Sequence, residues 1–308
     1  MMEKRYIEMV RLLIKAAPAV LEEGPFALKG GTALNLFIND LPRLSVDLDL
    51  VFIDRSTPRE TALRTIAESL ATTREKLSRL GIEAEVVPSK SGEECKLFIG
   101  HGSGFLKVEV NHVFRGTVRP VETREMVPFA REFFATGLET RTLAPAELYG
   151  SKLVAAMDRQ HPRDLFDVHR LYEAGGLTPD IVDCFVCYLA GHNRPVHEVL
   201  FSRPVDIEVA FSNEFAGMAR EPVSFEDLLE TRQRLQSELP AVLSSEHRRF
   251  LASLVEAEPD WSTAPCPHLS EMPAVRWKLE HLKKLKTSNP AKFALQSREL
   301  KSRLDMGL

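Results

Sequence analysis

The sequence is poor in cysteine and has no long hydrophobic run. Its 308 residues include only four cysteines: Cys95, Cys184, Cys187 and Cys266. These are too few and too scattered for a disulfide scaffold, so we expect a reducing, cytoplasmic location. No apolar stretch approaches the roughly 18–20 residues of a membrane-spanning helix. Residues 3–22 predict an amphipathic helix and not a signal peptide. We therefore expect no membrane partner.

Zinc and hydrolase signatures are also missing. Cys184 and Cys187 form a Cys-x-x-Cys pair inside the apolar run 181–190, but no second ligand pair follows at zinc-binding spacing. We interpret both cysteines as buried packing residues. No serine lies in a nucleophile elbow, and His161 and His169 have no recognisable triad partners.

Positive charge is concentrated near the end of the chain. The net charge is −4, yet nine Lys or Arg face only two Glu between Arg276 and Arg303. An acidic body with a basic tail indicates a polyanionic partner. Trp277 and Phe293 lie among these basic residues, and we expect them to stack on RNA bases. The alternative is a solvated helix that packs its leucine stripe on the body.

The most informative segment is 28–52, LKGGTALNLFINDLPRLSVDLDLVF. Asp47 and Asp49 are two positions apart in a predicted strand, so they point to the same face with Cα atoms roughly 6–7 Å apart. Their neighbours are apolar, and two acids in such a strand are costly to bury without a cation. A carboxylate pair suits Mg²⁺, with Mn²⁺ as a second choice, because substrate phosphates complete the coordination shell.

A glycine pair precedes these acids. Gly30 and Gly31 lack Cβ atoms, so the backbone can approach a ligand closely. Thr32 is expected to cap a helix over 33–38, whose free N–H groups would form a phosphate site. The glycine turn and the aspartates together predict a nucleoside triphosphate site. The simpler alternative is a turn, a capped helix and two solvated acids on an edge strand.

The element order predicts an α/β (α+β) fold, a small mixed sheet with helices on one side. We expect turns over 89–93 and 101–104, the latter closing a hairpin. The expected elements are helices over 3–22 and 61–80, and strands over 26–28, 47–53, 82–87, 95–100 and 105–113. Four segments follow along the chain: a core over 1–140, a helical domain over 141–254, a proline-rich linker over 255–275 and a basic helical tail over 276–308.

The motifs GGTAL and RLSVDLDLVF resemble those of the AbiEii/AbiGii nucleotidyltransferase toxins, close relatives of the MenT toxins. This branch belongs to the superfamily that shares the catalytic fold of DNA polymerase β. The superfamily is marked by a Gly-Ser or Gly-Gly pair, a short helix and Asp-x-Asp. Here Gly31-Thr32 stands where many members have Gly-Ser. The resemblance covers about residues 20–175.

The resemblance implies further site residues. Glu109 matches a third carboxylate on a neighbouring strand, which would be a metal ligand or the base for the attacking hydroxyl. The alternative is a solvent-facing acid that shares its face with Lys107. Lys152 matches a lysine on a helix over 143–160, which would neutralise the triphosphate as pyrophosphate leaves. The alternative for Lys152 is a snorkelling surface lysine.

The segment 162–168, PRDLFDV, resembles the family's R-D-L-[YF]-D-L motif. Asp164 and Asp167 are three apart on a helix and share a face. One is expected to hold Lys152 or a substrate hydroxyl, and the other to cap the helix start, in either order. Arg163 is expected to contact a phosphate or a carboxylate.

The resemblance implies a Mg²⁺-dependent nucleotidyltransferase that transfers NMP from an NTP to a hydroxyl, above all the 3′ end of tRNA. It also implies a toxin of a bacterial toxin–antitoxin or phage-defence system, with a cognate antitoxin as partner. One alternative acceptor is a protein or small-molecule hydroxyl. A glycosyltransferase would also use Asp-x-Asp but leaves the glycine pair unexplained. A non-enzymatic alternative is an NTP- or RNA-binding regulator with a decayed site.

Overall fold

The computed structural model describes residues 2–22, 24–88, 95–100 and 105–305, and the chain forms two compact units. Unit 1 comprises Met1–Leu148 and Phe215–Val223, and unit 2 comprises Tyr149–Glu214 and Ser224–Leu308. Among the described residues, none of the helices combines the length and the apolar character needed to cross a membrane.

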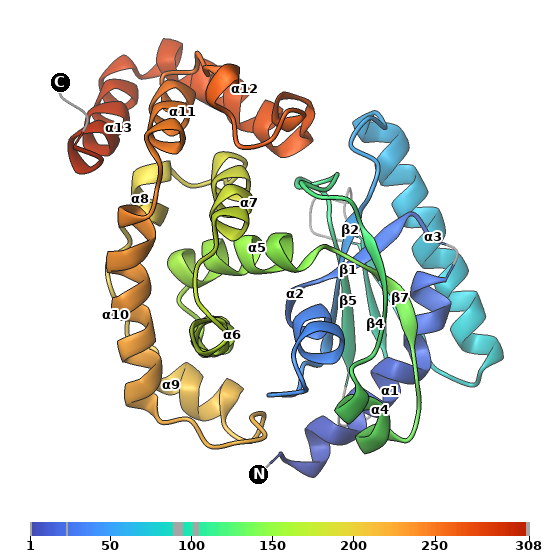
Figure 1. Ribbon diagram of the computed structural model, residues 1–308. Coiled ribbons are helices and arrows are strands. Elements are labelled where there is room, and N and C mark those ends of the chain that lie inside the picture. Colours follow the sequence, from blue (N-terminus) through green and yellow to red (C-terminus); the bar gives the residue numbers. More distant parts are fainter. Residues whose placement is uncertain (1, 23, 89–94, 101–104, 306–308) are drawn as a thin grey trace. The chain divides into compact units, whose positions relative to one another are not determined.

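Unit 1 is built on a seven-stranded sheet in the order β3-β4-β5-β2-β1-β7-β6 (Figure 1). The central strand β2 pairs in parallel with β5 and antiparallel with β1, so the sheet is mixed, as predicted. Its strands are β1 (Phe26–Lys29), β2 (Asp47–Phe52), β3 (Ala84–Pro88), β4 (Cys95–Ile99), β5 (Leu106–Asn111), β6 (Glu122–Glu125) and β7 (Glu139–Thr142).

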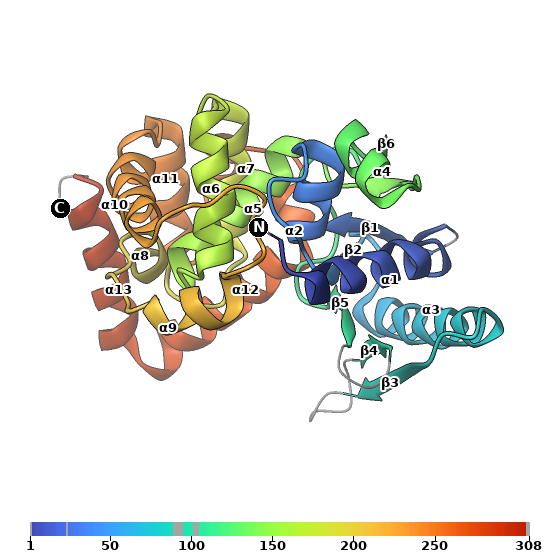
Figure 2. The same cartoon turned by 90° about the horizontal axis from the view of Figure 1, so that it is seen from below.

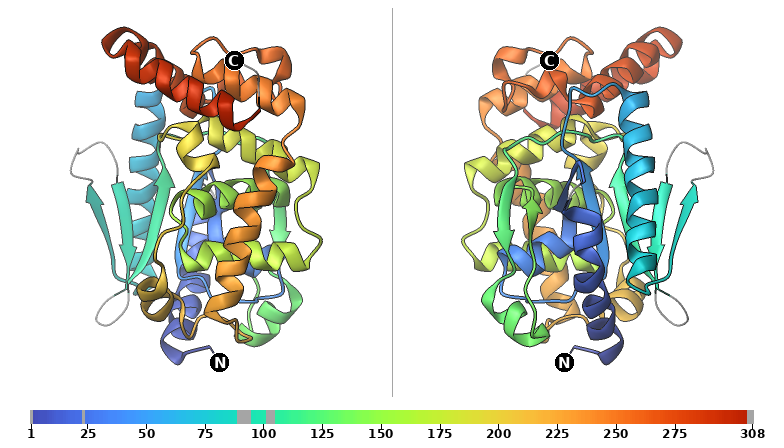
Figure 3. Two further views of the ribbon diagram at one scale, coloured as in Figure 1. Left: turned by 90° about the vertical axis from the view of Figure 1, so that its left-hand side faces the viewer. Right: turned by 90° about the vertical axis from the view of Figure 1, so that its right-hand side faces the viewer.

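Helices cover both faces of this sheet, whereas the sequence predicted them on one. The long helices α1 (Lys4–Leu21) and α3 (Arg59–Arg79) pack together against one face, and the right panel of Figure 3 shows both in front of the strands. The short helix α2 (Gly30–Ala33) continues as a π-helical turn, and Figure 2 shows it on the other side of β1 and β2. Unit 1 also contains α4 (Pro128–Phe134).

Two strands, β6 and β7, were not predicted from the sequence. β6 and β7 have the sequences ETRE and ETRT and form an antiparallel pair at one edge of the sheet. Their polar residues give no apolar alternation, so the pattern that marks a half-buried strand is absent. The expected pairing of the strands over 95–100 and 105–113 is confirmed, since β4 and β5 are antiparallel with Leu97 opposite Val108. The expected turns over 89–93 and 101–104 lie outside the described residues.

Unit 2 is helical. The left panel of Figure 3 shows α10 in front, and it packs along α6. α5 and α7 cross closely at Gly150, where an added Cβ would lie 2.6 Å from Cys184 Cβ. Cys184 and Cys187 are fully buried in α7, which confirms their predicted packing role. Its helices are α5 (Pro145–Asp158, which begins in unit 1), α6 (Pro162–Glu173), α7 (Pro179–Ala190), α8 (Val196–Leu200), α9 (Glu208–Ala210), α10 (Phe225–Ala241), α11 (Ser245–Val255), α12 (Pro273–Ser288) and α13 (Pro290–Arg303).

The segment 255–275, expected to be a linker, is folded into unit 2. It contains two short 3₁₀ turns, and Cys266, Leu269 and Met272 are buried because they fill the helical core. The basic tail is a hairpin of α12 and α13. Phe293 of α13 packs in a cluster with Leu282 and is only 9% exposed. The expectation that Phe293 stacks on a base is therefore wrong, because the hairpin buries its ring.

Candidate active site

Two aspartates lie on one face of the central strand of unit 1. Asp47 and Asp49 are half-buried, while Leu48 and Leu50 between and beside them are fully buried on the other face. β2 lies between β5 and β1, so the alternative of solvated acids on an edge strand is wrong. The alternation of acids and leucines explains this geometry, because successive strand residues point to opposite faces.

Gly30 lies directly against one of these carboxylates. Its φ is +72°, and an added Cβ would lie 2.3 Å from Asp49 Oδ2. Any other residue would strain the backbone and displace the carboxylate. At Gly31, an added Cβ would lie 2.7 Å from Arg43 Nη2 and 2.9 Å from Ser45 Oγ. The missing side chains of Gly30 and Gly31 thus leave room for Asp49 and for the buried Arg43, respectively.

Thr32 connects the glycine turn to the acid pair. Its hydroxyl donates to the backbone carbonyl of Asp47 at 2.5 Å, and its side chain is buried. The expected N-cap role is wrong, because α2 begins at Gly30 and Lys29 occupies the N-cap position without a side-chain hydrogen bond. Thr32 instead holds α2 and β2 together.

Arg43 is a buried charged residue that the sequence analysis left out of the site. Only 2% of it is exposed, and Nη1 donates to the carbonyl of Leu44 at 2.9 Å. Segment 215–223, which comes back to unit 1 from later in the chain, is bonded to the backbone beside Arg43, since Leu44 N donates to Met218 O at 2.9 Å. The Arg43 guanidinium lies against the Gly31 turn, where an added Cβ would be 2.7 Å from its Nη2.

A row of charged residues crosses four strands. Lys29 is opposite Asp49, Asp49 is opposite Glu109, and Glu109 is opposite Lys96. Glu109 Oε1 lies 2.5 Å from Lys96 Nζ, and Oε2 lies 2.7 Å from Lys107 Nζ. Partial burial opposes ionisation, but hydrogen bonds from Lys107 and Lys96 outweigh it and hold the pKa of Glu109 below its ordinary value. Glu109 is therefore bound by two lysines. One of them is Lys107, which was predicted to share its strand face.

A hollow of about 260 Å³ opens beside this row. Within the described part of the chain, no three His, Cys, Asp or Glu side chains are close enough to form a metal-binding cluster. The two aspartates of β2 nevertheless offer oxygen donors on one face, the donor type that Mg²⁺ prefers, and Mg²⁺ takes its remaining ligands from water or phosphate. The hollow is lined by Lys29, Asp49, Leu50, Lys96, Glu109, Val110, Asn111, His112 and Val113.

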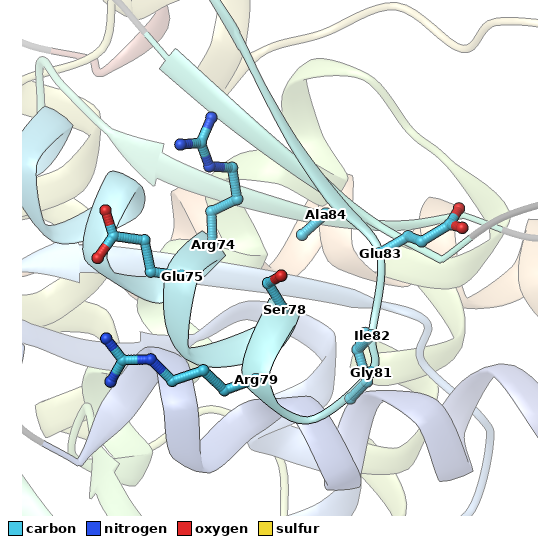
Figure 4. Close-up of a pocket in the computed structure, with 8 residues that line it drawn as sticks. All are labelled: Arg74, Glu75, Ser78, Arg79, Gly81, Ile82, Glu83 and Ala84. Atoms are coloured by element: carbon cyan, nitrogen blue, oxygen red, sulfur yellow. The ribbon is translucent and has the colours of Figure 1, made fainter.

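A larger hollow, of about 750 Å³, lies at the C-terminal end of α3 (Figure 4). It has neither a carboxylate pair on a strand nor a glycine turn against an acid, so we do not assign the chemistry to it. Its lining residues are Arg74, Glu75, Ser78, Arg79, Gly81, Ile82, Glu83 and Ala84.

In unit 2, Lys152 is buried against two aspartates. Its Nζ lies 2.8 Å from Asp164 Oδ1 and 3.1 Å from Asp167 Oδ2. The alternative of a snorkelling surface lysine is therefore wrong. Neither aspartate caps α6, because His161 holds that position and its Nδ1 accepts from the backbone N–H of Arg163 at 3.2 Å.

Arg159 completes this cluster and was missed by the sequence analysis. Its side chain is 59% exposed, yet Nε lies 2.6 Å from Asp164 Oδ2 and Nη2 donates to Oδ1 at 3.0 Å. Burial of Asp164 opposes its ionisation, but Lys152 and Arg159 outweigh it and hold the pKa of Asp164 well below its usual range. Asp164 and Asp167 thus face two cations, the buried Lys152 and the largely exposed Arg159.

Arg163 lies near a carboxylate, one of its two expected partners. Its Nη2 is 4.0 Å from Glu214 Oε2, the same oxygen that lies 3.0 Å from His161 Nε2. Burial lowers the pKa of His161 despite the hydrogen bond to Glu214. A phosphate contact by Arg163 stays a prediction.

Gly30→Ala tests the close approach to Asp49. We expect it to lower the free energy of unfolding, measured by chemical denaturation, and to abolish the nucleotide binding predicted for this site, measured by calorimetry with an NTP and Mg²⁺. The matched control is Gly81→Ala, because Gly81 has φ +70° but nothing within 4 Å of an added Cβ. The control should cost only about 1–2 kcal/mol of backbone strain and leave binding intact. Equal effects of the two variants on binding would contradict the assignment.

Lys152→Met tests the buried charge cluster. Removing the ammonium that two buried carboxylates bind should lower the free energy of unfolding by about 3–5 kcal/mol. Both tryptophans lie in unit 2, so urea unfolding followed by their fluorescence reports on this unit. The control Lys301→Met removes the partly exposed pair with Glu256 and should cost at most about 1 kcal/mol. If both variants lose the same stability, the cluster is not the buried anchor described here.

Comparison with known proteins gives a family and a similar fold. The family model of the nucleotidyl transferase AbiEii toxin, of type IV toxin–antitoxin systems, matches residues 11–281. The solved structure of MenT4, a nucleotidyltransferase toxin from Mycobacterium tuberculosis H37Rv, is similar with a TM-score of 0.59 at 19% identity, over 90% of this chain and 91% of that chain. Comparison with curated proteins gives no match. Because the family model spans most of the sequence, the chain belongs to the AbiEii nucleotidyltransferase toxin family.

Proposed function

We propose that this nucleotidyltransferase transfers NMP from an NTP to the hydroxyl at the 3′ end of tRNA, with Mg²⁺ or Mn²⁺ as cofactor. It would act as the toxin of a toxin–antitoxin pair whose partner protein restrains it, with phage defence as one setting for such a pair. The observation that carries this proposal is the acid pair Asp47 and Asp49 on one face of β2, with Gly30 against Asp49.

Asp47 and Asp49 are the proposed metal-binding residues. A bound Mg²⁺ would neutralise phosphate charge and polarise the bond to the leaving pyrophosphate. The Thr32 hydroxyl fixes the backbone of Asp47 by donating a hydrogen bond to its carbonyl. Gly30, Gly31 and Thr32 are the proposed phosphate contacts through their backbone N–H groups, because the space beside the two glycines is taken by Asp49, Arg43 and Ser45.

Glu109 is proposed as the third acidic residue, either as a metal ligand or as the base for the attacking hydroxyl. To serve as a ligand, Glu109 must exchange a contact with Lys96 or Lys107. Each released lysine would then be available to a phosphate.

Lys152 is proposed to bind the triphosphate, with Asp164 and Asp167 as its positioning residues. The bidentate contact of Arg159 satisfies Asp164 independently of Lys152. Asp164 is therefore the proposed structural anchor, and Asp167, at the longer distance of 3.1 Å, the proposed partner that adjusts as Lys152 engages phosphate. Arg163 is the proposed second phosphate contact.

Asp49→Asn tests the proposed chemistry. With labelled NTPs, Mg²⁺ and total tRNA, we expect the wild-type chain to label RNA and the variant to lose at least about 100-fold in rate, because the metal loses a charged ligand. The matched control is Asp54→Asn, since Asp54 only closes a turn through Ser56 and Thr57. Chelation of divalent cations should abolish labelling in every case.

The products distinguish the acceptors. Labelled protein bands without labelled RNA would move the proposal to a protein hydroxyl. If the wild-type chain and Asp49→Asn label RNA equally, the tRNA proposal is wrong. Induction in bacteria gives a second readout: growth should stop with the wild-type chain and continue with Asp47→Ala.

A further inference from the structure

The outer face of α12 carries three exposed basic side chains. Two other lysines of this helix anchor it to unit 2. Lys278 is buried and its Nζ donates to the backbone carbonyls of His192 and Arg194 at 2.9 and 2.6 Å, and Lys286 pairs with Glu258 at 2.8 Å. The basic residues left at the surface of α12 are Arg276, Lys283 and Lys284.

An exposed aromatic pair lies among these cations. Trp277 is 46% exposed, and its ring centroid lies 4.6 Å from that of His281, with the planes inclined by 54°. Positions four and seven apart share a helix face, so Lys284 continues the line of Trp277 and His281. Arg276 is held at the start of the helix, where Nε donates to Ser270 O at 3.1 Å.

These five residues, Arg276, Trp277, His281, Lys283 and Lys284, form what we call the α12 face. A single exposed tryptophan or lysine needs no explanation. Here an exposed ring pair and three cations share one side of a helix that has Glu280 as its one acid. In the described part of the chain, no acidic side chain lies within ion-pairing distance of Lys283 or Lys284.

Aromatic rings between cations fit unpaired nucleic acid. Bases stack on an exposed ring, at about 1–3 kcal/mol per base, while Lys and Arg bind the adjacent phosphates. An acidic protein would bind the same cations but has no base to stack on Trp277. The aromatic pair therefore favours a nucleic acid over an acidic polypeptide.

We propose that the α12 face is a docking site for an unpaired segment of RNA. Trp277 stacks on a base, supported by His281, and Arg276, Lys283 and Lys284 bind phosphates. This inference rests on the proposed RNA acceptor and names a second contact with that RNA. It is tested by binding, so it can fail separately from the transfer reaction.

Fluorescence gives a direct test, because the chain has two tryptophans. Trp261→Phe leaves Trp277 as the only one. Titration of this variant with total tRNA, and with a single-stranded oligoribonucleotide, should give saturable quenching of Trp277. In filter binding, Trp277→Ala should weaken RNA affinity about 10-fold, the loss of one stacked base.

The contribution of Lys283 and Lys284 can be measured separately, from the salt dependence of RNA affinity. Lys283→Ala/Lys284→Ala should make the slope of log K against log salt less steep by about 1.4, because two phosphate contacts are lost. The matched control is Lys292→Ala/Arg298→Ala, which removes the same charge from exposed positions of α13 outside the α12 face. The control should leave the salt slope nearly unchanged.

Three outcomes would overturn the docking site. They are RNA binding without quenching of Trp277, equal effects of the two double variants, and quenching by polyglutamate but not by RNA. Quenching by RNA in a protein that transfers no nucleotide to RNA would support the docking site and refute the proposed function. Transfer to RNA without quenching would support the proposed function and refute the docking site.

Discussion

The contact between Gly30 and Asp49 is the constraint on which the candidate site depends. A carboxylate oxygen lies where a Cβ would be, so the turn, the strand and the acid are positioned together. The positive φ of Gly30 directs the chain into α2, and Thr32 of that helix then holds the carbonyl of Asp47. One residue without a side chain therefore sets both the direction of the helix and the position of the acid pair.

Charge compensation is the second organising feature, and each unit achieves it differently. In unit 1, Glu109 lies at the surface of the sheet with Lys96 and Lys107, where solvent still reaches the groups. In unit 2, Asp164 and Lys152 are buried, and Arg159 reaches in from solvent to satisfy the second carboxylate oxygen. The first ion pairs are weakened by solvent, whereas the second cluster is an anchor, because an unpaired buried charge is strongly unfavourable.

The chain belongs to the AbiEii family. In unit 1, Asp47 and Asp49 lie half-buried on one face of β2, while in unit 2 two buried aspartates hold Lys152. The basic hairpin adds a surface of another kind: its inner side is packed through Leu282 and Phe293, and its outer side presents Trp277 beside cations. Packing thus separates the two aromatic residues that the sequence grouped together.

The sequence by itself determined the features that depend on local spacing. Period-two alternation placed Asp47 and Asp49 on one face, apolar periodicity predicted α1 and α3, and the glycine pair indicated a close approach. Tertiary structure alone decided the partners: the lysines of Glu109, the contact of Arg159 with Asp164, and the burial of Arg43 and Phe293. The reason is physical. A side chain's spacing is a property of its own segment, whereas its burial and charge partners depend on strand register and on helices that come from elsewhere in the chain.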